Sequence, residues 1–113
     1  MTASAAQQTA NGLLATGLTI TSTATPALNG TYMTQGRSLE AMQAEINSLL
    51  LNTNVFVDGS TSVNWPDKTG AGHEFTEAQF RTLVNAIDQF VVGCFQYGAG
   101  LTTTAPSSSA TIP

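Results

Sequence analysis

The sequence predicts a single α+β domain in which two amphipathic helices pack on a small antiparallel sheet. In two segments apolar residues recur every three or four positions, which is typical of helices with one buried face. Short alternating runs bounded by turn residues indicate strands. A chain of 113 residues has room for one such domain. We place it at residues 18–100, between an N-terminal arm at 1–17 and a C-terminal arm at 101–113.

Both predicted arms are rich in small polar residues and show no sustained apolar period. The C-terminal one contains a Thr run at 102–104 and a Ser run at 107–109. Such segments bury too little apolar surface to offset about 1 to 2 kcal/mol of backbone entropy per residue. We therefore expect extended arms that become ordered only against other protein chains.

Four strands are predicted in two pairs. Residues 18–21 alternate apolar and polar side chains, and residues 27–33 place an Asn-Gly turn between short apolar flanks. Pro26 stands between these two segments and indicates that at least one of them lies at a sheet edge. Residues 63–65 and 73–75 flank a Gly-rich turn, which predicts a hairpin with a long loop.

The first helix is expected at residues 38–51, with Ser38 as its N-cap. The Asn and Thr residues at 52–54 would end it, and residues 55–57 would follow as a short buried extended segment. The apolar residues that would share the buried face of this helix are Leu39, Met42, Ile46, Leu49 and Leu50.

The second helix carries the clearest start signal in the chain. Thr76 and Gln79 have the spacing of a capping box, and Phe75 and Phe80 occupy the two positions of a hydrophobic staple around it. We therefore expect this helix at residues 76–97. Its apolar stripe would consist of Phe80, Leu83, Val84, Ile87, Val91 and Cys94.

The charge content of the chain limits its partners. Charged residues make up 9%, against about 25% in an ordinary domain, and the net charge is −4. Arg37, Lys68 and Arg81 are the only cations, too few for a phosphate-binding patch, so we expect no nucleic-acid partner. No apolar run approaches the length of a membrane span, and we expect no membrane partner. A weakly ionic surface favours coverage by neighbouring subunits, including copies of this chain, although adhesive proteins share this composition.

The short stretch from Trp65 to Glu74 holds the residue types that chemistry would need. Asp67, His73 and Glu74 could form an acid–base or metal site, with His73 as base or ligand. The alternative, which we favour, is that Asp67 caps its turn while His73 pairs across the strands. Zinc needs three or four ligands, and there is no second His and no Cys pair. We predict no catalytic, metal-binding or cofactor-binding residue and no enzyme; Trp65, Asp67 and His73 remain candidates for contact with a partner.

The order of several short motifs resembles a family of small phage and prophage proteins. The motifs are Trp65-Pro66-Asp67, Gly70, His73, Phe75 and a long amphipathic helix that ends in an aromatic residue. Residues 18–23, 26–32 and 42–51 add to this resemblance. Related domains of otherwise unknown function occur in and beside phage tail and tail-fibre proteins. The resemblance brings no catalytic residues with it.

A virion component is therefore the function that the resemblance implies. A structural or adaptor protein of the tail, baseplate or fibre attachment, assembled in the host cytoplasm with other virion proteins, is the leading expectation. A head decoration protein is the nearest variant. The alternative from another class is a host-recognition module that binds glycan or protein through the loop at residues 65–73.

Overall fold

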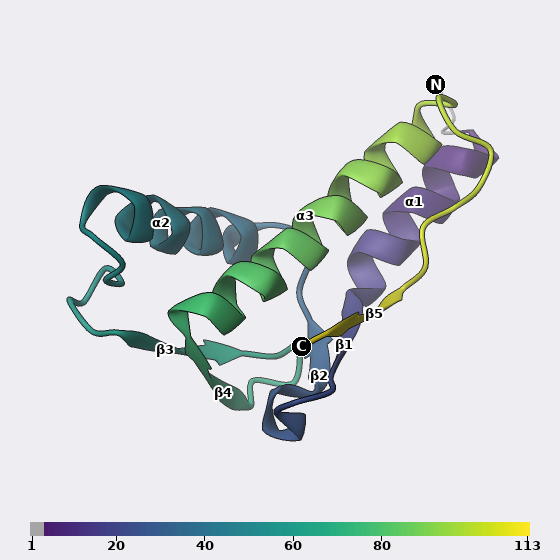
Figure 1. The fold of residues 1–113 in the computed structure, drawn as a ribbon. Coiled ribbons are helices and arrows are strands. Elements are labelled where there is room, and N and C mark those ends of the chain that lie inside the picture. Colours follow the sequence, from purple (N-terminus) through teal and green to yellow (C-terminus); the bar gives the residue numbers. More distant parts are fainter. Residues whose placement is uncertain (1–3) are drawn as a thin grey trace.

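A computed structural model of the protein describes residues 4–113, so residues 1–3 of the predicted N-terminal arm lie outside the described residues. The fold is a mixed α+β arrangement, as the sequence predicts. Figure 1 shows α3 across the middle, with α1 beside its C-terminal half and α2 at the opposite end of the molecule. The elements are α1 (Ala5–Thr16), β1 (Leu18–Ser22), the 3-10 turn η1 (Pro26–Leu28), β2 (Gly30–Tyr32), α2 (Arg37–Leu51), β3 (Ser62–Pro66), β4 (Gly72–Thr76), α3 (Glu77–Gly98) and β5 (Ser109–Ile112).

The strands form two small sheets instead of one. In the first, β1 lies between β2, which it pairs antiparallel, and β5, which it pairs parallel. The second is the predicted hairpin, in which β3 and β4 pair antiparallel with Trp65 opposite His73. The order along β1 of buried Leu18, exposed Thr19 and buried Ile20 confirms the alternation read from the sequence.

The predicted start of α3 is confirmed in detail. Thr76 is the N-cap, its side chain accepts a hydrogen bond from the Gln79 backbone N–H, and the Gln79 side chain bonds back to the Thr76 backbone. Phe75 and Phe80 are fully buried, with ring centroids 6.2 Å apart. The staple therefore anchors the hairpin and α3 in the same core.

The start of α2 and its preceding loop differ from the sequence expectation. Gly36, at φ +69°, is the N-cap of α2 in place of Ser38. The Asn-Gly pair does not form a hairpin turn, because Asn29 follows η1 and its side chain accepts a hydrogen bond from Ser22 N–H at 2.7 Å. Residues 55–57 form no strand, although Phe56 is buried as expected.

The N-terminal arm is the largest correction to the sequence analysis. Residues 5–16 form α1, and Ser4 and Gln7 make the same reciprocal capping box that starts α3. The helix packs along α3, where Gly98 allows close approach, since a Cβ there would lie 3.2 Å from the Ala10 Cβ. Ala10 is buried, and Leu13 packs partly buried against the core. One short apolar stripe, covered by α3 of the same chain, is thus enough to order the segment.

The C-terminal arm is also incorporated into the domain. Its last residues form β5, in which Ala110 and Ile112 alternate with exposed polar residues. Thr19 N–H donates to the Ser108 carbonyl, and Thr23 N–H donates to the Ile112 carbonyl. Backbone hydrogen bonds to β1 and the burial of Ile112 therefore order this arm within its own chain. The composition of the arm predicts instead that another protein would supply these contacts.

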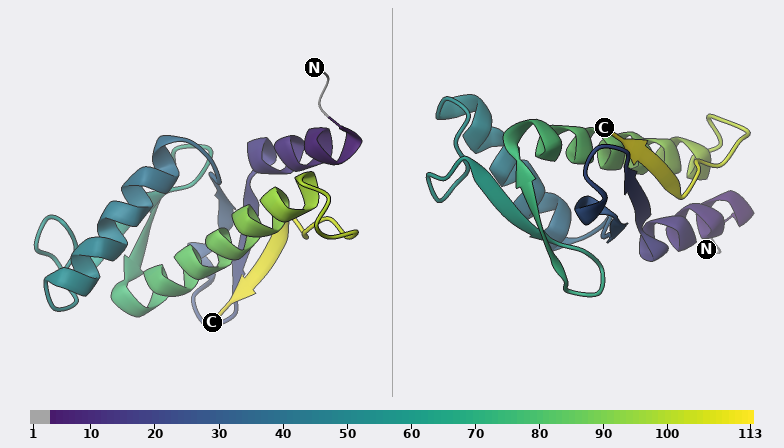
Figure 2. Two further views of the ribbon diagram at one scale, coloured as in Figure 1. Left: turned by 90° about the horizontal axis from the view of Figure 1, so that it is seen from above. Right: turned by 60° about the horizontal axis from the view of Figure 1, so that its bottom comes forward.

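The core lies where α3 crosses the two sheets, which Figure 2 shows from above and from below. Phe80 is packed edge-on against Phe56, Trp65 and Phe75, with centroid separations of 5.5, 5.2 and 6.2 Å. Among residues 4–113, no helix combines the length and hydropathy that crossing a bilayer requires.

Candidate functional site

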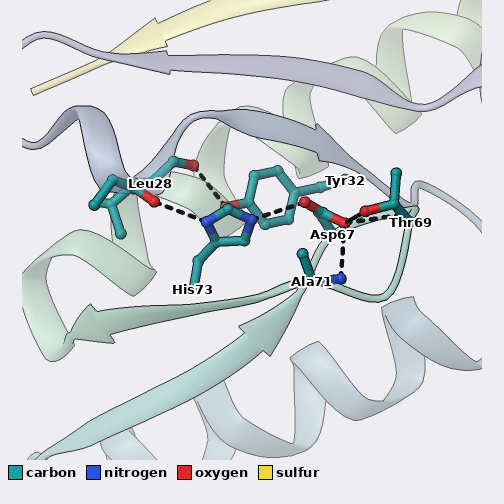
Figure 3. Close-up of polar contacts among 7 residues, drawn as sticks. Leu28, Tyr32, Asp67, Thr69, Ala71 and His73 are labelled. Atoms are coloured by element: carbon teal, nitrogen blue, oxygen red, sulfur yellow. Dashed lines mark hydrogen bonds and ion pairs between the residues drawn. The ribbon is translucent and has the colours of Figure 1, made fainter.

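The structure brings together two of the three candidate residues and separates the third. Asp67 and His73 form a pair at the loop end of the hairpin, with the His73 Nε2 atom 2.8 Å from the Asp67 Oδ2 atom (Figure 3). Trp65 is only 7% exposed and packs edge-on against Phe80. An indole covered to this extent belongs mainly to the core, so Trp65 offers a partner only the small part of its surface that lines the hollow between α2 and β3. It faces inward because its strand places it on the same side as Val63.

Asp67 holds the loop of the hairpin in shape. Its Oδ1 atom accepts hydrogen bonds from the Thr69 N–H at 2.8 Å, from the Thr69 hydroxyl and from the Ala71 N–H at 3.2 Å. This is the turn-capping role that the sequence favours. The hydrogen bond from His73, followed by those from Thr69, lowers the pKa of the Asp67 carboxyl well below its usual range. Asp67 is therefore a carboxylate at neutral pH.

Both ring nitrogens of His73 face groups that can only accept hydrogen bonds. Its Nδ1 atom lies 2.7 Å from the carbonyl oxygen of Ala27 in η1, and its Nε2 atom faces the Asp67 carboxylate. A ring that satisfies both must carry a proton on each nitrogen, so the arrangement favours the imidazolium form of His73. In agreement, the hydrogen bond to Asp67 and then that to Ala27 raise the pKa of His73.

Tyr32 completes the cluster from β2. Its hydroxyl donates to the Leu28 carbonyl at 2.6 Å, and its ring centroid lies 5.6 Å from that of His73. Burial, and then the charge of Asp67, raise the pKa of Tyr32, so its hydroxyl stays protonated. Gly30 leaves the space that the pair occupies, because a Cβ there would lie 3.2 Å from the Asp67 Oδ2 atom.

This arrangement links segments that are distant in the chain. His73 ties β4 to η1, and Lys68 ties the hairpin loop to α1, since its Nζ atom donates to the carbonyls of Ala15 and Thr16 at 2.8 and 3.1 Å. The sequence does not place Ala27, Tyr32 or Lys68 at the site. A backbone carbonyl acceptor leaves no mark in a sequence, and Lys68 could be recognised only by its position in the turn.

The chemistry open to the cluster is narrow. An imidazolium has no lone pair with which to bind a metal or accept a proton, so His73 in this state is neither a ligand nor a base. Within residues 4–113, no group of three or more His, Cys, Asp or Glu side chains is placed to hold a metal ion. Cys94 is buried, and burial raises the pKa of its thiol, whereas a reactive thiol needs a lowered one.

Comparison with family models, with curated protein sequences and with solved structures gave no match.

We expect stability to fall as the pH rises through neutrality because of His73. Its pKa is raised by folding, so the stabilisation it provides is complete below its unfolded pKa of about 6.5 and is lost as the pH rises through the folded value. Asp67, whose pKa is lowered, acts in the opposite direction and loses its contribution as the pH falls below about 4. Thermal melts between about pH 6 and pH 8 test the first effect, because the ordinary pKa values of carboxyls lie below this range and those of thiols lie above it.

The matched control is the His73→Gln variant in the same buffers. It should melt lower than the wild type at pH 6 and show a flatter dependence on pH up to pH 8, because the group that titrates has been removed. If the wild type and the variant lose stability in parallel over this range, His73 is not held as an imidazolium.

Proposed function

We propose that the protein is a structural or adaptor subunit of a bacteriophage particle, located in the tail, the baseplate or the fibre attachment. It would be assembled in the host cytoplasm with other virion proteins. The family that its motifs resemble supports this assignment. So does the state of the one candidate site, whose polar groups bond to one another and act as a cross-link within the fold.

The observation that carries the proposal is that, within residues 4–113, large apolar side chains are exposed at both ends of an elongated molecule. At the end of α2 and in the loop beyond it, Leu50, Leu51 and Val57 are 66, 81 and 67% exposed. The expectation that Leu50 shares the buried face of α2 is therefore wrong, since this face ends at Leu49. At the end of α3, Phe95 and Leu101 are each 72% exposed. Figure 1 shows the C-terminal ends of these helices on opposite sides of a molecule that is 46 Å long. Apolar side chains grouped in this way favour contact with neighbouring proteins.

Purified particles from a host that produces the phage test the proposal. Mass spectrometry with subunit counting should find the protein in a fixed copy number per particle. Particles made with a Leu50→Ser/Leu51→Ser variant should lack it, while the purified variant should lose no more than about 1 kcal/mol of stability, because both side chains are already largely in water and serine lowers helix propensity only slightly. The protein's absence from wild-type particles would overturn the proposal.

The same particles separate the variants of this function. A head decoration protein would remain on heads purified from a phage that makes no tails, whereas a tail or baseplate subunit would not. A host-recognition module would be identified by binding of the purified protein to host glycans through its hairpin loop. The burial of Trp65 takes from that loop the aromatic surface that sugar binding commonly uses.

A further inference from the structure

The outer edge of β3 is an unpaired strand edge. β3 bonds to β4 on one side only. Just beyond the strands, Asp67 N–H donates to the Ala71 carbonyl at 2.8 Å, which marks a hydrogen-bonded pair. Bonded and non-bonded pairs alternate along an antiparallel ladder, so Asn64, three residues earlier, belongs to a non-bonded pair. Its backbone N–H and C=O therefore point away from β4, and within residues 4–113 no backbone group pairs with them.

The groups on this edge are self-complementary. Ser62 and Pro66 lie two residues to either side of Asn64 and also face outward. If a second β3 ran antiparallel with Asn64 opposite Asn64, Ser62 of each copy would face Pro66 of the other. Proline has no N–H to offer the Ser62 carbonyl, and the Ser60 hydroxyl, which lies 2.7 Å from that carbonyl, shares its single proton with the Asp58 carboxylate. In this register the missing donor affects only the two end pairs and leaves the central Asn64 pair complete.

Helix α2 flanks the same edge and carries complementary charges. A hollow of about 450 Å³ separates α2 from β3, and Arg37, Ala41 and Glu45 of α2 line it together with Val63 and Trp65. The three α2 residues are spaced four apart and so share one face of the helix. Arg37 is exposed and makes no ion pair among the described residues, while Glu45 uses only its Oε1 atom, to accept from the Val57 N–H at 2.8 Å.

We propose that this face binds a second copy of the chain in a two-fold dimer. The two β3 strands pair antiparallel about Asn64 and join the two hairpins into one four-stranded sheet. The same axis sets the α2 helices antiparallel across Ala41, whose small side chain allows close approach. Arg37 of each copy then meets Glu45 of the other, and each Val63 packs beside the other copy's Trp65. Such an interface is isologous, because each copy contributes the same surface.

This inference goes beyond the proposed function and does not depend on it, since it concerns the isolated chain and uses none of the exposed apolar side chains at the two ends of the molecule. Sedimentation velocity of the purified protein over a range of concentrations should show a reversible monomer–dimer equilibrium. A protein that stays monomeric at the highest concentration would overturn the proposal. The β3 edge would then be free to pair with a strand of another protein.

The strand contact is tested by Asn64→Pro. The Asn64 N–H takes no part in the β3–β4 ladder, so proline removes the central bond of the interface and leaves the hairpin bonds in place. The variant should be monomeric, with a circular dichroism spectrum like that of the wild type. A dimer of wild-type affinity would show that β3 does not form the contact.

The charge contact is tested by reversal, which does not depend on whether Asn64→Pro folds. Arg37→Glu and Glu45→Arg should each weaken self-association by about tenfold or more, because like charges then face each other twice. Mixing the two variants should restore dimers, since every cross-pair in the mixed dimer is again opposite in sign. Glu40→Arg, which changes the net charge equally on α2 but lies outside the hollow, should dimerise as the wild type does. Variants that all associate like the wild type, or a mixture that does not recover, would overturn the arrangement.

Discussion

Replacing Phe80 with Ala should lower the free energy of unfolding by about 3 to 5 kcal/mol. The Phe80 ring is fully buried and lies at the point where the hairpin, the loop after α2 and α3 meet, edge-on to three other aromatic rings. Truncation to Ala removes the apolar surface that these rings bury and leaves a cavity that rigid neighbours cannot fill. Urea denaturation measures this loss directly, provided that the unfolding free energy falls with urea concentration at the same slope in the variant and the wild type.

Phe95→Ala is the matched control on the same helix. This phenylalanine is 72% exposed, so its loss should change the unfolding free energy by no more than about 0.5 kcal/mol. Both substitutions replace the same residue type within α3 and so change helix propensity alike. If Phe80→Ala lowers the unfolding free energy by less than about 1 kcal/mol, the staple does not stabilise the core beneath the helix.

The parts of the fold that can be predicted are those specified by residues close together in the chain. The Thr76 capping box, the Phe75 staple and the hairpin each depend on partners a few positions apart, and all are confirmed. The Asp67 turn belongs to the same class, because its acceptor and donors lie within four residues. Short-range geometry of this kind requires particular residue types at fixed spacings, and those spacings can be recognised in the sequence alone.

The errors arise where distant segments stabilise one another. The pairing of β1 with β5 joins Ser22 and Ile112, and no local spacing encodes it. The bond from His73 to the Ala27 carbonyl crosses 46 positions and leaves no sequence signal. The α1 segment is a different case, since Ser4 and Gln7 carry the same box that identifies α3. The polar composition of this segment predicts an extended arm, although the segment carries a valid helix start signal.

Gly17 is expected to be intolerant of any side chain, and Gly17→Ala is the second substitution with a large expected effect. Gly17 ends α1 at φ +93° and ψ −177°, a region that is essentially restricted to glycine and costs other residues about 1 to 3 kcal/mol. An added Cβ would also lie 2.6 Å from the Tyr32 carbonyl oxygen. That oxygen belongs to the backbone of β2 and cannot move without disturbing the β1–β2 pairing, so the clash should cost a further amount of about 1 to 3 kcal/mol.

Gly12→Ala supplies the opposite expectation within the same helix. Gly12 lies inside α1 with no atom within 4 Å of the position that a Cβ would occupy, so alanine there should stabilise the protein by about 0.5 to 1 kcal/mol through helix propensity. In urea denaturation, the free energy of unfolding should be lower than that of the wild type for Gly17→Ala and higher for Gly12→Ala. Since the composition of α1 predicts an unstructured arm, the pair also tests its order: in an extended arm neither substitution would change stability measurably, and the packing of α1 on α3 would then be refuted.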